Sequence, residues 1–230
     1  FPTRRSSDLG SVELDGSLTL TGTQSVMISN SFTGSGLLVM ANPYQVNQHN
    51  ENQNIILTAF EGDNSSFTGE MSMTSSTYFE PKYSYSVGAG TLSFETSILS
   101  LTGSLNLTPF SISLTGDNCA ILNEGNNTLS SSIGIQQNAT CFYVPLEGSL
   151  AVLGSIEGDG ALIVGFNTLA LRGSLILDAS AHTYSGGTKI ISGTLSTQGN
   201  LGTGTIQLLG GNLLLGQGVS LNNSVTISGG

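Results

Sequence analysis

The sequence predicts an all-β solenoid, a chain wound into coils whose short strands stack on one another. Charged residues make up only 9% of the chain, so the strong helix formers Glu, Lys and Arg are scarce. Gly is abundant at 31 residues, and much of the remainder is Ser, Thr and Asn, which favour turns and strands over helices. A third observation is a recurring pattern: Gly, any residue, an apolar residue, any residue and usually another apolar residue.

Each copy of this pattern predicts one half-buried strand, because apolar side chains at every second position fall on one side of an extended backbone. The leading Gly permits the tight turn that separates one strand from the next. In chain order the copies begin at Gly16, Gly69, Gly90, Gly103, Gly148, Gly160, Gly173, Gly204 and Gly211, and a weaker copy begins at Gly193.

The spacing of the copies predicts coils. The interval from Gly69 to Gly90 suits one full turn, and the shorter interval from Gly148 to Gly160 suits two faces of one turn. A short strand with one apolar side cannot bury that side alone, but stacked coils bury it against the next coil. A β-sandwich is the alternative, since it also contains short strands divided by turns. We favour the solenoid because dipeptides typical of hairpin turns are rare and directly precede predicted strands.

Two segments stand apart from the repeat. Residues 1–9, "FPTRRSSDL", match nothing downstream and resemble the translation of a DNA-sequencing adapter, so we expect an artefact and exclude them from the fold. Residues 10–230 are predicted to form a single repeat array. Within it, residues 41–54 are polar, carry a proline and show no alternation, which predicts a loop insertion ejected from the coil. Such insertions can bind partners, and a loop with no role is the alternative.

The charge of the chain excludes one class of partner. The chain has 15 acidic residues against 5 Lys and Arg, a net charge of −10, so it lacks the basic surface that nucleic-acid binding needs. The acidic residues are scattered singly, which favours a role in solubility over a metal site. No apolar run approaches the roughly 20 residues that a membrane-spanning helix requires.

Residue patterns that carry catalysis are absent from the sequence. It contains no Cys-x-x-Cys, His-Glu-x-x-His, Walker or Gly-x-Ser-x-Gly motif, and His182 is predicted to be a solvated turn residue. A polysaccharide-cleaving β-helix would need paired carboxylates, and the close pairs are Glu61 with Asp63 and Glu157 with Asp159, each in a predicted turn. We therefore expect no enzyme, no catalytic residue, no cofactor and no metal.

The segment from Gly173 to Leu215 resembles the passenger-associated transport repeat of bacterial autotransporters. That repeat has a Gly-x-Leu strand, a Tyr-Ser-Gly-Gly-Thr turn, an Ile strand and then Gly-Thr-Leu. The residues that carry the resemblance are Leu175, Leu177, Tyr184, Ser185, Gly186, Gly187, Thr188, Ile190, Ile191, Gly193, Thr194 and Leu195. Weaker echoes occur at 30–40 and 64–73, with Phe in place of Tyr, whereas residues 104–147 depart from the family pattern.

The resemblance implies a right-handed parallel β-helix on the extracellular side of a Gram-negative outer membrane. It implies a non-catalytic passenger scaffold, secreted or displayed at the cell surface by a secretion machinery, whose adhesive ligand would be a host protein or a glycan. Passengers of this family precede a C-terminal β-barrel that is missing here, and membrane attachment is expected only through that barrel. The alternatives are an adhesin of the two-partner haemagglutinin type and a β-helical polysaccharide-active enzyme.

The only cysteines, Cys119 and Cys141, are separated by close to the length of one coil. If they occupy equivalent positions in successive coils, their α-carbons are about 4.8 Å apart, within the range of roughly 4.4–6.8 Å that a disulfide spans. The compartment that the resemblance implies is oxidising, so we predict a candidate disulfide. Two buried thiols are the alternative.

Overall fold

The chain forms a parallel β-solenoid. The computed structural model describes residues 10–22, 25–41, 57–74, 77–117, 119–136, 140–143, 148–165 and 173–228. Every pairing between the strands named below is parallel. The described residues contain no α-helix and a single short 3-10 turn, η2 (Ser84–Ser86). The predicted all-β parallel β-helix is confirmed.

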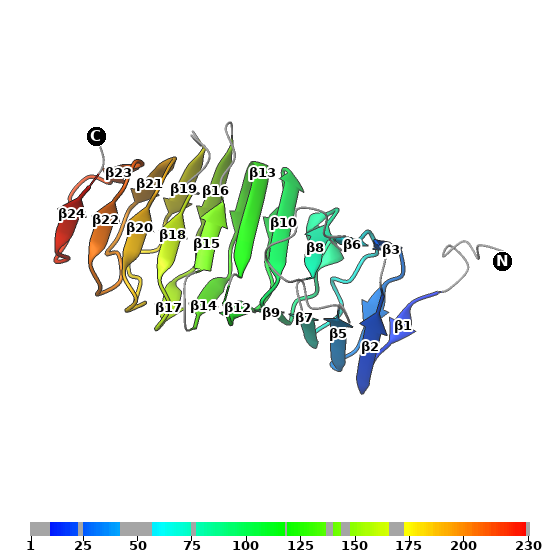
Figure 1. Cartoon of the computed structure of the whole chain (residues 1–230). Helices are drawn as coiled ribbons and strands as arrows, with labels where there is room; N and C mark the ends of the chain where they lie inside the picture. Colours follow the sequence, from blue (N-terminus) through cyan, green and yellow to red (C-terminus); the bar gives the residue numbers. More distant parts are fainter. Residues whose placement is uncertain are drawn as a thin grey trace.

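The strands lie on three faces of a rod, with the first and last described coils at opposite ends (Figure 1). The long face consists of β3 (Val26–Ile28), β6 (Leu57–Phe60), β8 (Tyr78–Pro81), β10 (Ile98–Gly103), β13 (Ala120–Leu129), β15 (Thr140–Tyr143), β18 (Leu162–Val164), β20 (Thr188–Ile190), β22 (Ile206–Leu208) and β24 (Val225–Ile227). The second face consists of β2 (Ser17–Thr21), β5 (Leu37–Ala41), β7 (Glu70–Thr74), β9 (Thr91–Glu95), β12 (Ser111–Thr115), β14 (Ser132–Ile135) and β17 (Ile156–Gly158).

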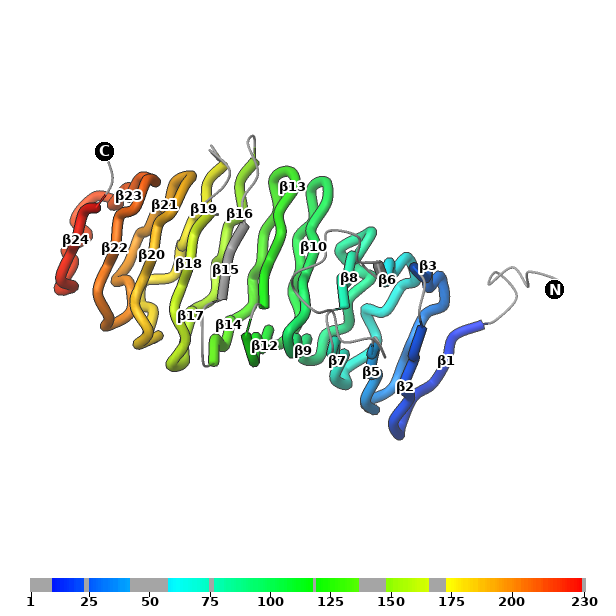
Figure 2. Tube along the Cα trace, viewed as in Figure 1, coloured from blue at the N-terminus to red at the C-terminus, as the bar shows by residue number. Residues whose placement is uncertain are grey.

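The third face begins further along the chain than the other two. Its members are β11 (Asn106–Leu107), the second half of β13, β16 (Ser149–Val152), β19 (Ser174–Leu177), β21 (Thr194–Thr197) and β23 (Asn212–Leu215). In the N-terminal coils β1 (Val12–Glu13) pairs with β4 (Phe32–Thr33) in a separate two-stranded sheet. The backbone trace visits these faces in turn, and each circuit sets the next coil beside the last (Figure 2).

The alternating pattern places apolar side chains in columns along the inside of the rod. On the second face each inward side chain pairs in register with its equivalent in the next coil, so one column contains Leu18, Leu38, Met71, Leu92, Ile112, Ile133 and Ile156. From Leu38 onward these side chains are at most 1% exposed. Burial of each side chain contributes about 1.5–3 kcal/mol, so the column stabilises the contact between coils.

Aromatic rings extend the core of the N-terminal coils. The ring centroids of Phe32 and Phe60 are 6.1 Å apart, those of Phe60 and Phe79 are 5.2 Å apart, and those of Phe79 and Phe94 are 6.2 Å apart. All four rings are buried and tilted relative to their neighbours, an arrangement that adds to the stabilisation from buried area. The core is therefore continuous from coil to coil.

The length of a coil is close to the spacing predicted from the glycines, with one large exception. Leu99 pairs with Ile121 and Ile121 pairs with Phe142, so one circuit is about as long as the interval between Gly69 and Gly90. The circuit from Met27 to its partner Ala59 is much longer. The predicted insertion at 41–54 falls within this long circuit and, apart from Ala41 at the end of β5, lies outside the described residues, as do residues 1–9.

Candidate functional surface

The Tyr-Ser-Gly-Gly-Thr segment, residues 184–188, is a turn whose tyrosine side chain points into the core of the coil. The Tyr184 side chain is fully buried, and its hydroxyl lies 2.7 Å from Oγ1 of Thr188. Burial raises the pKa of Tyr184 to about 12. The backbone N–H of Ser185 donates to the carbonyl of Gly158 at 3.0 Å.

The glycines of the same repeat take backbone conformations that side chains disfavour. Gly187 and Gly193 have φ angles of 86° and 76°. A Cβ at Gly186 would overlap the backbone of Gly160. Thr194 and Leu195 continue into β21, where Leu195 is fully buried. The residues that the sequence singled out thus position the coil and do not form a binding site.

His182, two residues before this turn, is buried, so the prediction that it is a solvated turn residue is wrong. It is 3% exposed, and its Nδ1 accepts a hydrogen bond from the backbone N–H of Ile156 at 3.0 Å. Ile156 begins β17, the last strand of the second face, so no further strand offers a carbonyl oxygen to its backbone N–H. The imidazole of His182 supplies the acceptor instead. Because Nδ1 accepts, the proton lies on Nε2, which is buried without a hydrogen-bond partner among the described residues. Burial lowers the pKa of His182.

Buried asparagines have the same role in other coils. Oδ1 of Asn64 accepts from the backbone N–H of Phe32 at 2.7 Å, and Oδ1 of Asn127 accepts from that of Leu105 at 2.7 Å. A buried backbone N–H without a partner is costly, and these side chains supply the acceptor from the adjacent coil. The inward polar residues are therefore structural.

The two cysteines are offset in register and do not occupy equivalent positions. Cys141 pairs with Ala120, not with Cys119. The side chain of Cys119 is buried, and its Sγ lies 2.9 Å from the carbonyl oxygen of Thr115 and 3.3 Å from that of Phe94. The side chain of Cys141 lies outside the described part of the structure. The candidate disulfide stays a prediction, which thiol titration of the unreduced, denatured protein decides.

The close acid pairs have separate, local surroundings. Glu61 accepts a hydrogen bond from the Ser29 hydroxyl at 3.3 Å, and hydrogen bonds from Ser65 lower the pKa of Asp63. Glu157 lies within β17 and not in the turn that the sequence predicted, and the exposed Asp159 follows the strand. Neither pair is part of an enclosed site.

A partly buried ion pair on the long face also links coils. Nζ of Lys82 lies 2.8 Å from Oε1 of Glu80, which accepts a further hydrogen bond from the Thr102 hydroxyl of the next coil at 2.7 Å. Burial raises the pKa of Glu80, but the hydrogen bonds from Lys82 and Thr102 lower it by more, so the pKa is below its usual value. The carboxylate therefore acts as a clamp between two coils.

A column of glycines forms the corner at which the chain enters the second face. The strand register, extended to the preceding position, aligns Gly16, Gly36, Gly69 and Gly90 in successive coils. A Cβ at Gly90 would overlap the carbonyl oxygen of Gly69, and a Cβ at Gly69 would overlap that of Gly36. The close approach of the preceding coil therefore leaves no room for a side chain at Gly36, Gly69 and Gly90.

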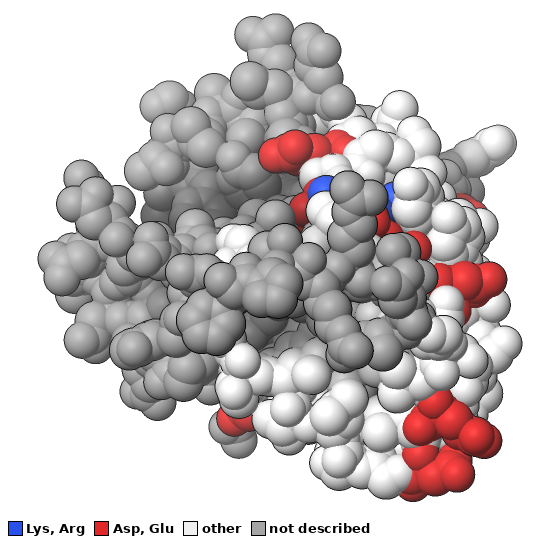
Figure 3. Space-filling model, turned by 90° about the vertical axis from the view of Figure 1, so that its right-hand side faces the viewer, with Lys and Arg blue, Asp and Glu red and all other residues white. Residues whose placement is uncertain are grey.

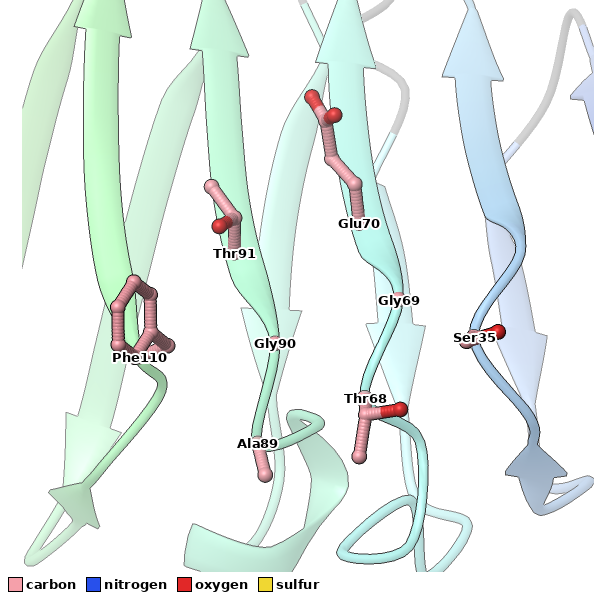
Figure 4. Close-up of a pocket in the computed structure, with 8 residues that line it drawn as sticks. All are labelled: Ser35, Thr68, Gly69, Glu70, Ala89, Gly90, Thr91 and Phe110. Atoms are coloured by element: carbon pink, nitrogen blue, oxygen red, sulfur yellow. The ribbon is translucent and has the colours of Figure 1, made fainter.

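A groove of about 470 Å³ follows this corner. Its floor is the backbone of Gly69 and Gly90, and Phe110 closes it at one end while Ser35 lies at the other (Figure 4). The lining residues, which we call the corner groove, are Ser35, Thr68, Gly69, Glu70, Ala89, Gly90, Thr91 and Phe110. The groove crosses the beginnings of four strands of the second face, so it is formed by stacking of the coils.

Phe110 is the residue that the sequence analysis missed. It aligns with Gly90, and its backbone N–H donates to the carbonyl oxygen of Gly90 at 2.9 Å, yet its side chain is 81% exposed. The signal was present in the sequence, because Phe110 to Leu114 has the alternation of the repeat but has Phe where the repeat has Gly. Because the ring of Phe110 is exposed where the repeat has Gly, packing of the coils does not explain why Phe occupies this position.

The remainder of the described surface offers few charged groups in combination. Tyr83 and Tyr85 are exposed and stacked, with ring centroids 5.0 Å apart. The view onto the N-terminal end of the rod shows acidic side chains at several places and basic ones at one (Figure 3). Among the described residues no group of three or more His, Cys, Asp or Glu is placed to hold a metal ion. The described part of the chain also has no helix with the length and apolarity needed to cross a membrane.

Comparison of the chain with models of protein families, with curated proteins and with solved structures finds no match.

Proposed function

We propose that the chain is a passenger scaffold of the autotransporter type, a non-catalytic rod that is secreted or displayed at the surface of a Gram-negative bacterium and carries adhesive contacts. The observation that carries the proposal is the fit between the family pattern and the structural role of each matching residue. Tyr184 fills the core at a turn, Gly187 supplies a positive φ angle, and the buried Leu195 pairs in register with the buried Leu175 of the preceding coil. The resemblance therefore lies at positions that stacked coils require.

The architecture suits a chain that emerges progressively from a secretion pore. Each coil contacts only its neighbours, so a stack can grow coil by coil as the chain emerges. The columns of Leu, Ile, Met and Phe supply the driving force for each addition. Growth of the stack coil by coil therefore supports the proposal independently of the sequence resemblance.

A scaffold role also fits the distribution of reactive groups. His182 and Tyr184 are buried and bonded to structural partners, and Glu80 is paired with Lys82 on the long face. His182 and Glu80 thus each bond to a neighbouring coil. The corner groove, in contrast, is open and lined by hydroxyl groups, a carboxylate and an exposed ring, which suits binding more than chemistry.

Surface display is tested on intact cells. The open reading frame that contains this chain is expressed in a Gram-negative host, and intact cells are labelled with an antibody raised against residues 10–228. We expect labelling that proteinase K added outside the cells removes, while a periplasmic marker protein survives the same treatment. Antigen that is detected only after the cells are lysed would contradict the proposal.

A further inference from the structure

The fold does not require the phenyl ring of Phe110. The equivalent corner position holds a small residue in each of the other coils of the second face, namely Gly16, Gly36, Gly69, Gly90, Ser131 and Gly154. A small residue therefore satisfies the backbone at this corner. The ring of Phe110 is 81% exposed, so it gains little from burial in the folded chain. Large aromatic side chains with this exposure beside a groove are typical anchors for a ligand.

The walls of the corner groove suit a ligand that carries many hydroxyl groups. Thr68, Thr91 and Ser35 contribute hydroxyl groups, and the exposed carboxylate of Glu70 accepts hydrogen bonds. Oγ1 of Thr91 already bonds Oγ of Ser111 at 3.2 Å, which fixes its orientation. Glu70 and Phe110 lie two coils apart, about 10 Å at the usual strand spacing. This distance is comparable with a disaccharide or trisaccharide unit.

Other ligand classes fit the corner groove less well. The lining contains Glu70 and no Lys or Arg, and the chain has a net charge of −10, so anionic ligands are repelled. A peptide cannot add as a strand here, because β7, β9 and β12 are each paired on both sides. An amphipathic helix would need an apolar groove, whereas Ala89 and Phe110 are the only apolar side chains in the lining.

We propose that the corner groove binds a neutral oligosaccharide, with the apolar face of one sugar ring on Phe110 and hydroxyl groups bonded to Glu70 and Thr91. An aromatic ring contributes large apolar contact area, and the polar walls fix the orientation of the sugar. The inference names the ligand class of the adhesive scaffold and rests on that proposed function. The binding itself requires only the folded chain, so it can be measured apart from surface display.

The test uses purified protein and four neutral probes: cellotetraose, maltotetraose, mannotetraose and N-acetylchitotetraose. Binding is followed by saturation-transfer NMR and isothermal titration calorimetry. We expect at least one probe to bind with a dissociation constant on the order of 1 mM or tighter. Phe110→Ala is expected to weaken that binding at least about tenfold, and Glu70→Gln about threefold, whereas Phe110→Trp retains it.

The matched control is Tyr83→Ala, which removes an exposed ring outside the corner groove and is expected to leave binding unchanged. Circular dichroism and the thermal midpoint verify that each variant is folded. If Phe110→Ala does not fold, Phe110→Ser takes its place, because Ser131 occupies the equivalent corner in the next coil.

Three outcomes overturn the inference. These are no binding of any probe, equal binding by wild type and Phe110→Ala, and Phe110-dependent binding of tetralysine in place of the sugars, which would assign the corner groove to a cationic ligand. Failure of the proposed function is distinguishable, because cells without surface antigen would leave the binding of the purified protein unaffected.

Discussion

Residues 104–147 and 173–215 form coils of different construction. The first region departs from the family pattern, yet it contributes β12 and β14 to the second face and contains the long strand β13. The second region matches the family pattern best, yet residues 173–228, all described, contribute no strand to the second face. Its coils are also shorter, since the step from Ile190 to its partner Leu208 is shorter than the step from Leu107 to its partner Leu129 in the first region.

The difference shows that the glycine-rich family pattern does not predict where the strands of the second face lie. In the second region the family turn lies beside β17 in place of a further strand, because the backbone N–H groups of Thr183 and Ser185 donate to the carbonyl oxygens of Ile156 and Gly158. Side chains that bond the backbone of an adjacent coil occur in both regions, as His182 and Asn127 show. The family pattern thus marks a tight turn where the first region has a strand of the second face. Alternating apolar residues, with or without the pattern, form the stacked strands.

The largest expected effect comes from the buried column of the first region. Leu114 is fully buried between Phe94 and Ile135, so Leu114→Ala is expected to lower the free energy of unfolding by about 2–5 kcal/mol. Leu213→Ala, near the C-terminal end of the described stack, removes a partly buried side chain and is expected to cost about 1 kcal/mol. Urea unfolding followed by circular dichroism measures both. Equal losses would contradict the lower burial of the C-terminal end of the stack.

A smaller effect separates glycines inside and outside the repeat pattern. Gly90→Ala places a Cβ on the carbonyl oxygen of Gly69 and is expected to cost about 2 kcal/mol or more. Gly134, in β14, has only the carbonyl oxygen of Ile112 near its Cβ position, at 3.9 Å, so Gly134→Ala is expected to change stability by less than about 1 kcal/mol. Thermal unfolding of the two variants makes the comparison. If Gly90→Ala left the thermal midpoint unchanged, the close approach of the coils at this corner would not exclude a side chain.

The smallest effect concerns pH and the turn of the second region. The pKa of His182 is lowered from 6.5 in the folded chain, so the unfolded chain binds more protons and stability falls as the pH drops below about 6.5. One such group changes the free energy of unfolding by at most about 1.4 kcal/mol per pH unit. His182→Asn should keep the acceptor, as Asn64 and Asn127 do, and remove the pH dependence between about pH 7.5 and 5.5.

Hydrogen exchange near β17 measures this effect at both pH values, after correction for the intrinsic rate. A wild-type chain whose β17 protection is as high at the lower pH as at the higher one would contradict the role given to His182.

The strands were predictable from the sequence because alternation is a local property. The copies at Gly16, Gly69 and Gly90 each lead into a strand of the second face, as the pattern predicted. The stacking of these glycines could not be predicted from neighbouring residues, because it depends on the close approach of successive coils. The length of a coil was recoverable only because the pattern recurs.

The surroundings of single polar residues were not predictable. His182 precedes a turn, and a sequence cannot show that the turn folds inward against β17. Cys141 is offset from Cys119 because the circuit at this point is one residue shorter than the interval between the two cysteines, so Cys141 pairs with Ala120. Phe110 could have been found by asking which copy of the repeat lacks its glycine, because a repeat makes such an exception visible.

The central claim is that both regions belong to one continuous stack, and double electron–electron resonance tests it most directly. Labels at Ile98 and Thr226, in a Cys119→Ala and Cys141→Ala background, are six strand spacings apart on the long face, about 29 Å. Labels at Ile98 and Lys189 are four spacings apart, about 19 Å. We predict two narrow distributions that differ by about 10 Å. Equal distances, or a broad distribution for the longer pair, would contradict a single stack.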